Sequence, residues 1–189
     1  MSIDDDFFNK RRSVLAKKMS SDPINKEDLN SILQAGIRVP DHGALNPWKL
    51  KVIQGDTLKK IDEEIILSEF IKTQPDSKKD AQDIESKRLQ RAGAVIVVLS
   101  TPVDHPSIPL WEMQLSSGAV CMNLLSTAQS KGYAAQWLTE WYSYNDKMLT
   151  TLGGTVGKDK IAGFIYIGHK IAEPNERKRP DPKKVISHI

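Results

Sequence analysis

The segment LWEMQLSSGAVCMNLLSTAQSK, residues 110–131, is predicted to be the longest helix of this chain. Its apolar residues fall on nearly every side of a helix, and Gly132 follows as a stop signal. A helix without a polar face lies either at the centre of a fold or in a subunit interface. The apolar positions are Ala119, Val120, Met122, Leu124 and Leu125.

Four apolar runs around this helix predict strands. Residues 94–100 form an unbroken apolar run, typical of a fully buried strand. Residues 48–53 alternate Trp48, Leu50 and Val52 with lysines, which predicts a half-buried strand. The other two runs are 133–137 and 161–168.

Further helices are predicted between these strands, at residues 6–12, 25–38, 57–70 and 145–152. Asn25 and Asp28 suggest a capping-box-like start for the second of them, and Pro40 ends it. The charged stretch 72–83, which contains Pro75, is expected to be a mobile loop or lid.

Composition places the chain among globular proteins of one domain, residues 1–189. The net charge of +3 is too mild to require a polyanionic partner, and the four histidines lack the spacing of metal ligands. Cys121 is alone, and a buried, inert thiol is expected. The acidic start of the chain and the lack of a long apolar run predict no signal peptide and no membrane span, hence a cytoplasmic protein.

Two polar clusters suggest a cofactor site. Arg11, Arg12 and Ser13 supply planar charged forks and a hydroxyl, which suit a phosphate. The turn at 38–48 holds Arg38, His42 and a tryptophan just before a strand. The chain has no nucleophile elbow, HExxH motif, P-loop or GxGxxG fingerprint, so no catalytic side chain is assigned from motifs.

Six motifs, in order along nearly the whole chain, resemble the nitroreductase family of FMN-dependent oxidoreductases, in particular its short, compact branch. The six are Arg11-Arg12-Ser13, the turn from Val39-Pro40-Asp41-His42 to Pro47-Trp48, the helix start 110–118, the strand 132–139, the strand 161–168 and the tail 177–182.

The resemblance implies an α+β fold with a mainly antiparallel central sheet flanked by helices, in a homodimer that shares two FMN sites. It implies an enzyme that passes electrons from NADH or NADPH to nitroaromatics, quinones or similar small-molecule acceptors. Neither the donor nor the acceptor is selected by a motif. The residues that would bind FMN are Arg11, Arg12, Ser13, Arg38, His42, Trp137, Leu138, Thr139, Arg177 and Arg179, with Arg38 and His42 reaching it from the second subunit.

Two departures from the family pattern keep an alternative open. Leu15 stands where larger members carry a lysine, and the turn at 45–48 lacks their glutamine. A flavin-binding protein for storage or sensing, with little turnover, is therefore the second hypothesis. A nucleic-acid-binding module is disfavoured, because the basic tail is short and has no aromatic stacking pattern beside it.

Overall fold

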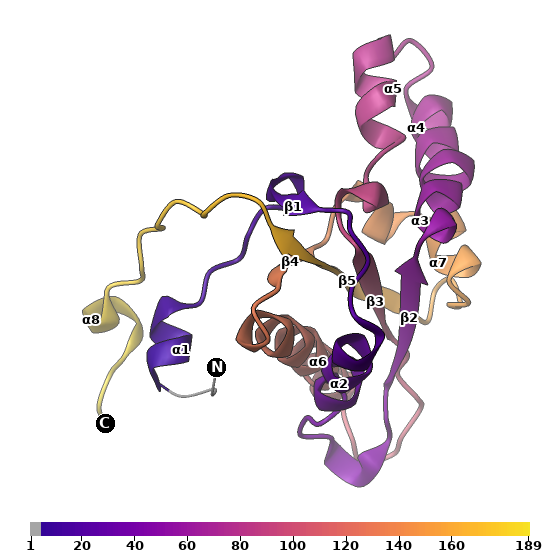
Figure 1. The fold of residues 1–189 in the computed structure, drawn as a ribbon. Coiled ribbons are helices and arrows are strands. Elements are labelled where there is room, and N and C mark those ends of the chain that lie inside the picture. Colours follow the sequence, from indigo (N-terminus) through magenta and orange to yellow (C-terminus); the bar gives the residue numbers. More distant parts are fainter. Residues whose placement is uncertain (1–4) are drawn as a thin grey trace.

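A five-stranded antiparallel sheet lies between two layers of helices in the computed structural model, which describes residues 5–189 (Figure 1). Residues 1–4, where the acidic start of the chain begins, lie outside the described residues. Strand order is β1-β5-β3-β2, and β4 also pairs with β5. The strands are β1 (Met19–Ser20), β2 (Trp48–Gln54), β3 (Ala94–Ser100), β4 (Ala134–Leu138) and β5 (Lys160–Lys170). The predicted antiparallel α+β architecture is confirmed.

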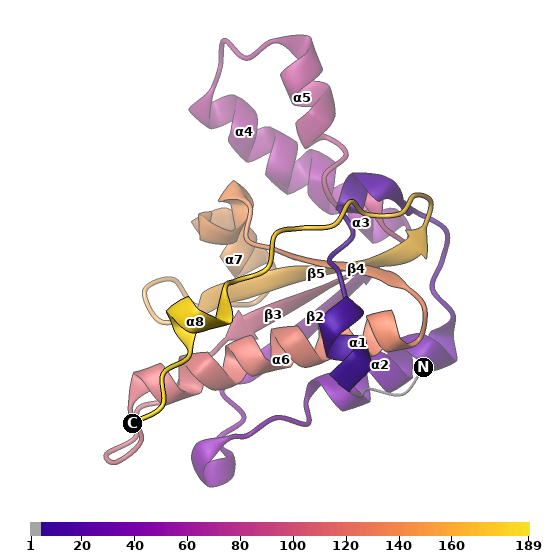
Figure 2. The ribbon, with the colours of Figure 1, turned by 90° about the vertical axis from the view of Figure 1, so that its left-hand side faces the viewer.

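One face of the sheet is covered by α2 (Lys26–Gly36) and α6 (Leu110–Ser130) (Figure 2). Their apolar side chains pack on Ile96, Val98 and Ile165 of the central strands. The approach of α2 to α6 is close, because a Cβ on Gly36 would lie 2.3 Å from a methyl carbon of Leu124. The long predicted helix is therefore central to the fold.

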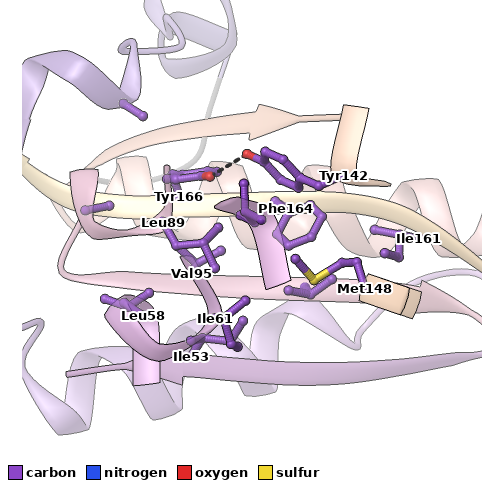
Figure 3. Packing of buried hydrophobic residues seen from close by; sticks show 14 of the residues in the cluster. Ile53, Leu58, Ile61, Leu89, Val95, Tyr142, Met148, Ile161, Phe164 and Tyr166 are labelled. Carbon is purple, nitrogen blue, oxygen red and sulfur yellow. Dashed lines mark hydrogen bonds between the residues drawn. The ribbon is translucent and has the colours of Figure 1, made fainter. Parts of the chain in front are cut away.

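The opposite face carries the remaining helices of the core. A continuous helical stretch runs through α3 (Asp56–Ile61), a π-helical segment (Asp62–Leu67) and α4 (Ser68–Thr73), followed by α5 (Lys79–Glu85) and α7 (Asp146–Thr151). Figure 3 shows the apolar cluster below them, where the hydroxyl groups of Tyr142 and Tyr166 are 2.7 Å apart and satisfy each other. Figure 1 shows α4 and α5 projecting beyond the sheet.

The remaining helices are short. The two terminal ones are α1 (Asp5–Lys10) and α8 (Pro182–Val185), and the other four are single turns at Ala16–Lys18, His42–Ala44, Leu89–Arg91 and Trp141–Tyr144. None of the helices within residues 5–189 is long and apolar enough to cross a membrane.

Three sequence-based expectations need correction. The stretch 72–83 is not simply a loop, because α5 begins at Lys79, where a Lys79–Asp83 ion pair of 3.1 Å spans one turn. Val52 is exposed, since β2 is an edge strand whose Ile53 faces the opposite core. Asp28 does not close a capping box; its carboxylate accepts hydrogen bonds from Lys131 and Tyr133, and Asn25 alone caps the helix.

Exposed apolar side chains follow one side of α6. Trp111 and Leu115 are 66% and 53% exposed, and Gly118 and the half-buried Met122 continue the same stripe at helical spacing. A row of large apolar side chains on a core helix is a candidate interface.

Candidate functional site

The chain after α1 is fastened to the end of the sheet and to the last turns of α6. Val14 donates its backbone N–H to the carbonyl of Ala135 on β4, at 3.2 Å. Gln129 of α6 donates from Nε2 to the carbonyl of Arg12, at 2.6 Å. These two bonds fix the backbone on both sides of Ser13, so the predicted Arg-Arg-Ser motif is anchored to β4 and α6.

The C-terminal tail returns beside this segment, as Figures 1 and 2 both show. Arg12 donates from Nη2 to the carbonyl of Asn175 at 2.7 Å, and Lys18 donates from Nζ to the carbonyl of Glu173 at 3.4 Å. The tail arginines are thereby brought to the N-terminal ones. A hollow of about 590 Å³ is lined by Arg11, Arg12, Ser13, Arg177, Lys178, Arg179 and Pro180.

This hollow concentrates positive charge. Burial, and then the nearby guanidinium groups of Arg179 and Arg12, lower the pKa of Arg11. The carboxylate of Glu176 lies among them, 3.1 Å from Arg179 Nη2 and 3.7 Å from Arg12 Nε. A hydrogen bond from the backbone N–H of Arg177, and then the two guanidinium charges, lower the pKa of Glu176. Because the arginines already bind one carboxylate, we expect the hollow to prefer anionic ligands.

Two buried polar atoms on or beside the arginine cluster make no hydrogen bond within residues 5–189. Arg12 Nε and Gln129 Oε1 are buried and make no hydrogen bond to any residue in the described part of the chain. Buried polar groups are normally satisfied, so such atoms mark where a ligand or a water molecule would bond. Arg12, which lines the hollow, therefore has a spare donor for a ligand, and Gln129 has a spare acceptor beside the Arg12 backbone.

A second hollow, of about 400 Å³, adjoins the first and shares Arg12, Ser13 and Arg177 with it. The other lining residues are Leu15, Lys18, Gln136, Trp137, Pro174 and Asn175. Trp137 is 38% exposed and donates from Nε1 to the carbonyl of Ala162 at 3.0 Å. The indole lies so close to β5 that a Cβ on Gly163 would be 2.0 Å from Nε1. A flat aromatic surface thus adjoins the arginine cluster.

Leu138 and Thr139 follow Trp137 but line neither hollow. Leu138 packs against the core cluster, and Thr139 is exposed just beyond the end of β4.

Lys18 and Gln136 belong to the second hollow although their sequence positions did not indicate it. Lys18 brings an ammonium group to the hollow that Leu15 also lines. Gln136 accepts a hydrogen bond from the backbone N–H of Ala16 at 2.6 Å, which ties the segment to β4.

Arg38 and His42 lie elsewhere. Arg38 is exposed, and its backbone carbonyl accepts a hydrogen bond from Asn123 of α6 at 2.9 Å. His42 Nδ1 is 2.7 Å from Glu112 Oε2, at the first turn of α6, whereas Arg12 is bonded to Gln129 near the last turn. Glu112 and Gln129 are separated by 17 positions, which is roughly 25 Å at the rise of an α-helix. One copy of the chain therefore does not bring His42 to the arginine cluster.

Other reactive groups offer no second centre. Burial raises the pKa of Cys121 to about 12, so its thiol stays protonated and unreactive, as expected from sequence. Within residues 5–189, no group of three or more histidine, cysteine, aspartate or glutamate side chains is arranged to hold a metal ion.

Comparison with known proteins places this geometry in context. The model of the Nitroreductase family matches residues 9–169. The chain is 28% identical over 184 residues to the Escherichia coli K12 protein named "Putative NAD(P)H nitroreductase YdjA", covering 95% of each. Among solved structures, a nitroreductase-like family protein from Bacillus cereus superposes with a TM-score of 0.83 at 23% identity, covering 100% of this chain and 98% of that one. A nitroreductase from Bacteroides fragilis, solved with bound FMN, superposes with a TM-score of 0.69 at 20% identity, covering 97% of this chain and 97% of that one.

Proposed function

The chain belongs to the nitroreductase family, and we propose that it is an FMN-dependent oxidoreductase. It passes electrons from NADH or NADPH to a nitroaromatic, a quinone or a similar electron-poor acceptor. The arginine cluster beside an exposed indole is the observation that carries this proposal. The name of the E. coli relative supports the NAD(P)H donor, and the FMN-bound Bacteroides structure supports the cofactor.

The residues present fit the phosphate end of FMN. Arg11, Arg177 and Arg179 offer planar donor forks to an anion, and a guanidinium–phosphate contact can be bidentate. An incoming phosphate would displace the Glu176 carboxylate, whose side chain is 71% exposed. The tail therefore contributes half of the proposed phosphate site.

The residues also fit the polar and aromatic parts of the cofactor. Arg12 and Ser13 adjoin both hollows, so they are placed for the ribityl chain and the pyrimidine edge. Arg12 Nε, which makes no hydrogen bond to the described residues, supplies a donor there. Trp137 would border the ring, whereas Leu138 and Thr139 line neither hollow.

When bound, FMN supplies the hydride and electron chemistry, while the protein binds, orients and tunes it. The positive charge of Arg12 and Lys18 favours negative charge that develops nearby. Trp137 lines the second hollow and would cover one side of a group bound there. Leu15 places an apolar side chain where larger relatives carry a lysine, and Lys18 brings an ammonium group to the same hollow.

A second copy of the chain would complete the site. His42 lies roughly 25 Å along α6 from the arginine cluster of its own chain, so it would serve the cofactor held by the partner. The exposed stripe of Trp111, Leu115 and Met122 on α6 offers the apolar contact for such a homodimer. Arg38 would accompany His42 across the interface.

Titration of the purified full chain with FMN, followed by flavin fluorescence, tests the cofactor. We expect saturation at one FMN per chain. Addition of NADH or NADPH without oxygen should then bleach the visible flavin band, and a nitroaromatic or quinone should restore it. Failure to bind FMN would refute the proposal. Binding without reduction by either nucleotide would favour the storage or sensing alternative.

A further inference from the structure

We propose that Glu112 is a positioning residue for His42. Its carboxylate accepts a hydrogen bond from Nδ1–H of His42 and leaves Nε2 as an acceptor for an O–H or N–H donor of a ligand. The part of this inference that concerns FMN rests on the proposed function, whereas the Glu112–His42 pair itself does not.

The backbone around His42 is fastened to α6 at both ends of the turn. Ser116 donates from Oγ to the carbonyl of Pro40 at 2.6 Å. Ser117 Oγ lies 3.1 Å from the carbonyl of Pro47 and shares its one hydroxyl hydrogen between that carbonyl and the carbonyl of Met113, at 3.0 Å. Both serines are buried. Since the same helix also carries Glu112, the carboxylate and the turn are parts of one rigid unit.

The turn itself holds an unusual backbone conformation. Ala44 and Asn46 have φ values of 51° and 49°, in the left-handed region that residues other than glycine seldom adopt. Asp41 stabilises it by accepting the backbone N–H of Asn46 at 2.7 Å. Left-handed residues persist where the surroundings over-determine them, often at ligand sites. The direction in which His42 leaves the backbone is thereby fixed.

The orientation of the imidazole then depends on Glu112. His42 Nδ1 lies 2.7 Å from Glu112 Oε2. Within residues 5–189, the imidazole of His42 makes no other hydrogen bond. An ionised carboxylate only accepts hydrogen bonds, so Nδ1 must carry the hydrogen. In the neutral ring Nε2 then has a free lone pair. The side chain of His42 is 60% exposed, and a ligand donor can reach that atom.

FMN offers such donors in its ribityl hydroxyl groups and its ring N–H. A fixed ring loses less rotamer freedom when the ligand binds, which is the benefit of preorganisation. Removal of Glu112 should therefore affect FMN affinity through His42 and not through a contact of its own.

Nitrogen NMR of the full chain labelled with ¹⁵N-histidine tests the pair directly, with His42→Ala identifying the signals. At about pH 8.5, two units above the ordinary histidine pKa, wild type should show His42 as the Nδ1–H tautomer. Glu112→Ala should shift the population toward Nε2–H. Glu112→Gln should give an intermediate population, because its amide can accept from Nδ1–H through the oxygen or donate to a bare Nδ1 through the nitrogen. An unchanged tautomer in Glu112→Ala would overturn the inference.

FMN titration provides the second arm. Glu112→Ala and His42→Ala should each weaken binding by roughly three- to tenfold, the usual effect of one hydrogen bond. The double variant should be no weaker than either single one. Glu63→Ala, which removes an exposed helical glutamate paired with Lys59 at 3.8 Å, serves as a matched control and should not change affinity. Additive effects of the two changes would contradict the inference.

Failure of wild type to bind FMN would refute the proposed function, and the tautomer measurement would still decide whether Glu112 orients His42.

Discussion

Arg11→Ala should remove much of the affinity for FMN with little effect on folding. The side chain of Arg11 is half-buried in the arginine cluster, where burial and the charges of Arg179 and Arg12 lower its pKa. It makes no side-chain hydrogen bond or ion pair within residues 5–189. Removing it relieves repulsion in the free protein, so thermal stability should stay the same or rise slightly.

The expected loss of affinity follows from one charge-assisted contact. A hydrogen bond to a charged group contributes about 1.5–3 kcal/mol, and each 1.4 kcal/mol is tenfold in affinity. Arg11→Ala should therefore weaken FMN binding by roughly 10- to 150-fold. Arg11→Lys keeps the charge but loses the planar fork, so its loss should be smaller.

The assay is fluorescence titration with FMN and, in parallel, with riboflavin, which lacks the phosphate. Lys60→Ala is the charge-matched control, because it removes one exposed cation on α3. The large effect of Arg11→Ala should disappear when riboflavin is the ligand. An equal loss for both ligands, or no loss for FMN, would refute the assignment of Arg11 to the phosphate.

Three further changes test other parts of the structure. Glu176→Gln should strengthen FMN binding by roughly two- to fivefold in the same titration, because an exposed carboxylate no longer competes for the arginines; weaker binding would contradict this. Asp62→Ala should lower the free energy of unfolding, measured in urea, by about 3 kcal/mol, because the backbone N–H groups of Leu89 and Gln90 and the Gln90 side-chain amide lose their buried acceptor. Asp62→Asn should lower it less. Gly163→Ala should lower the free energy of unfolding by about 1–3 kcal/mol, because the new Cβ clashes with the Trp137 indole. In a Trp137→Ala background the same change should cost less. An undiminished cost in that background would show that the strain arises elsewhere.

The main elements were predictable because burial imposes their patterns. The β3 segment is buried at every position, so its unbroken apolar run was a direct sign of a central strand. Residues 110–131 likewise matched α6 to within one residue. By contrast, β1 is two residues long and exists only through its pairing with the end of β5. Helix α5 is short, and its sequence has no apolar periodicity that would predict a helix.

The site was less predictable because it depends on long-range placement. Arg12 and Asn175, which join the two halves of the arginine cluster, are 163 residues apart. No local pattern encodes that contact, so only the family resemblance grouped Arg177 and Arg179 with Arg11. The resemblance assigned no site role to Glu176, Lys18 or Gln136, which lie in the tail, just before β1 and on β4.

Subunit mixing tests most directly the central claim that each FMN site combines Arg11 of one chain with His42 of its partner. An Arg11→Ala chain and a His42→Ala chain, each impaired alone, are combined in heterodimers isolated with two affinity tags. A shared site predicts one doubly defective site and one intact site, with activity recovering to at most about half of wild type by two-fold symmetry. Verified heterodimers that show no recovery, while both single variants remain folded and dimeric, would contradict it.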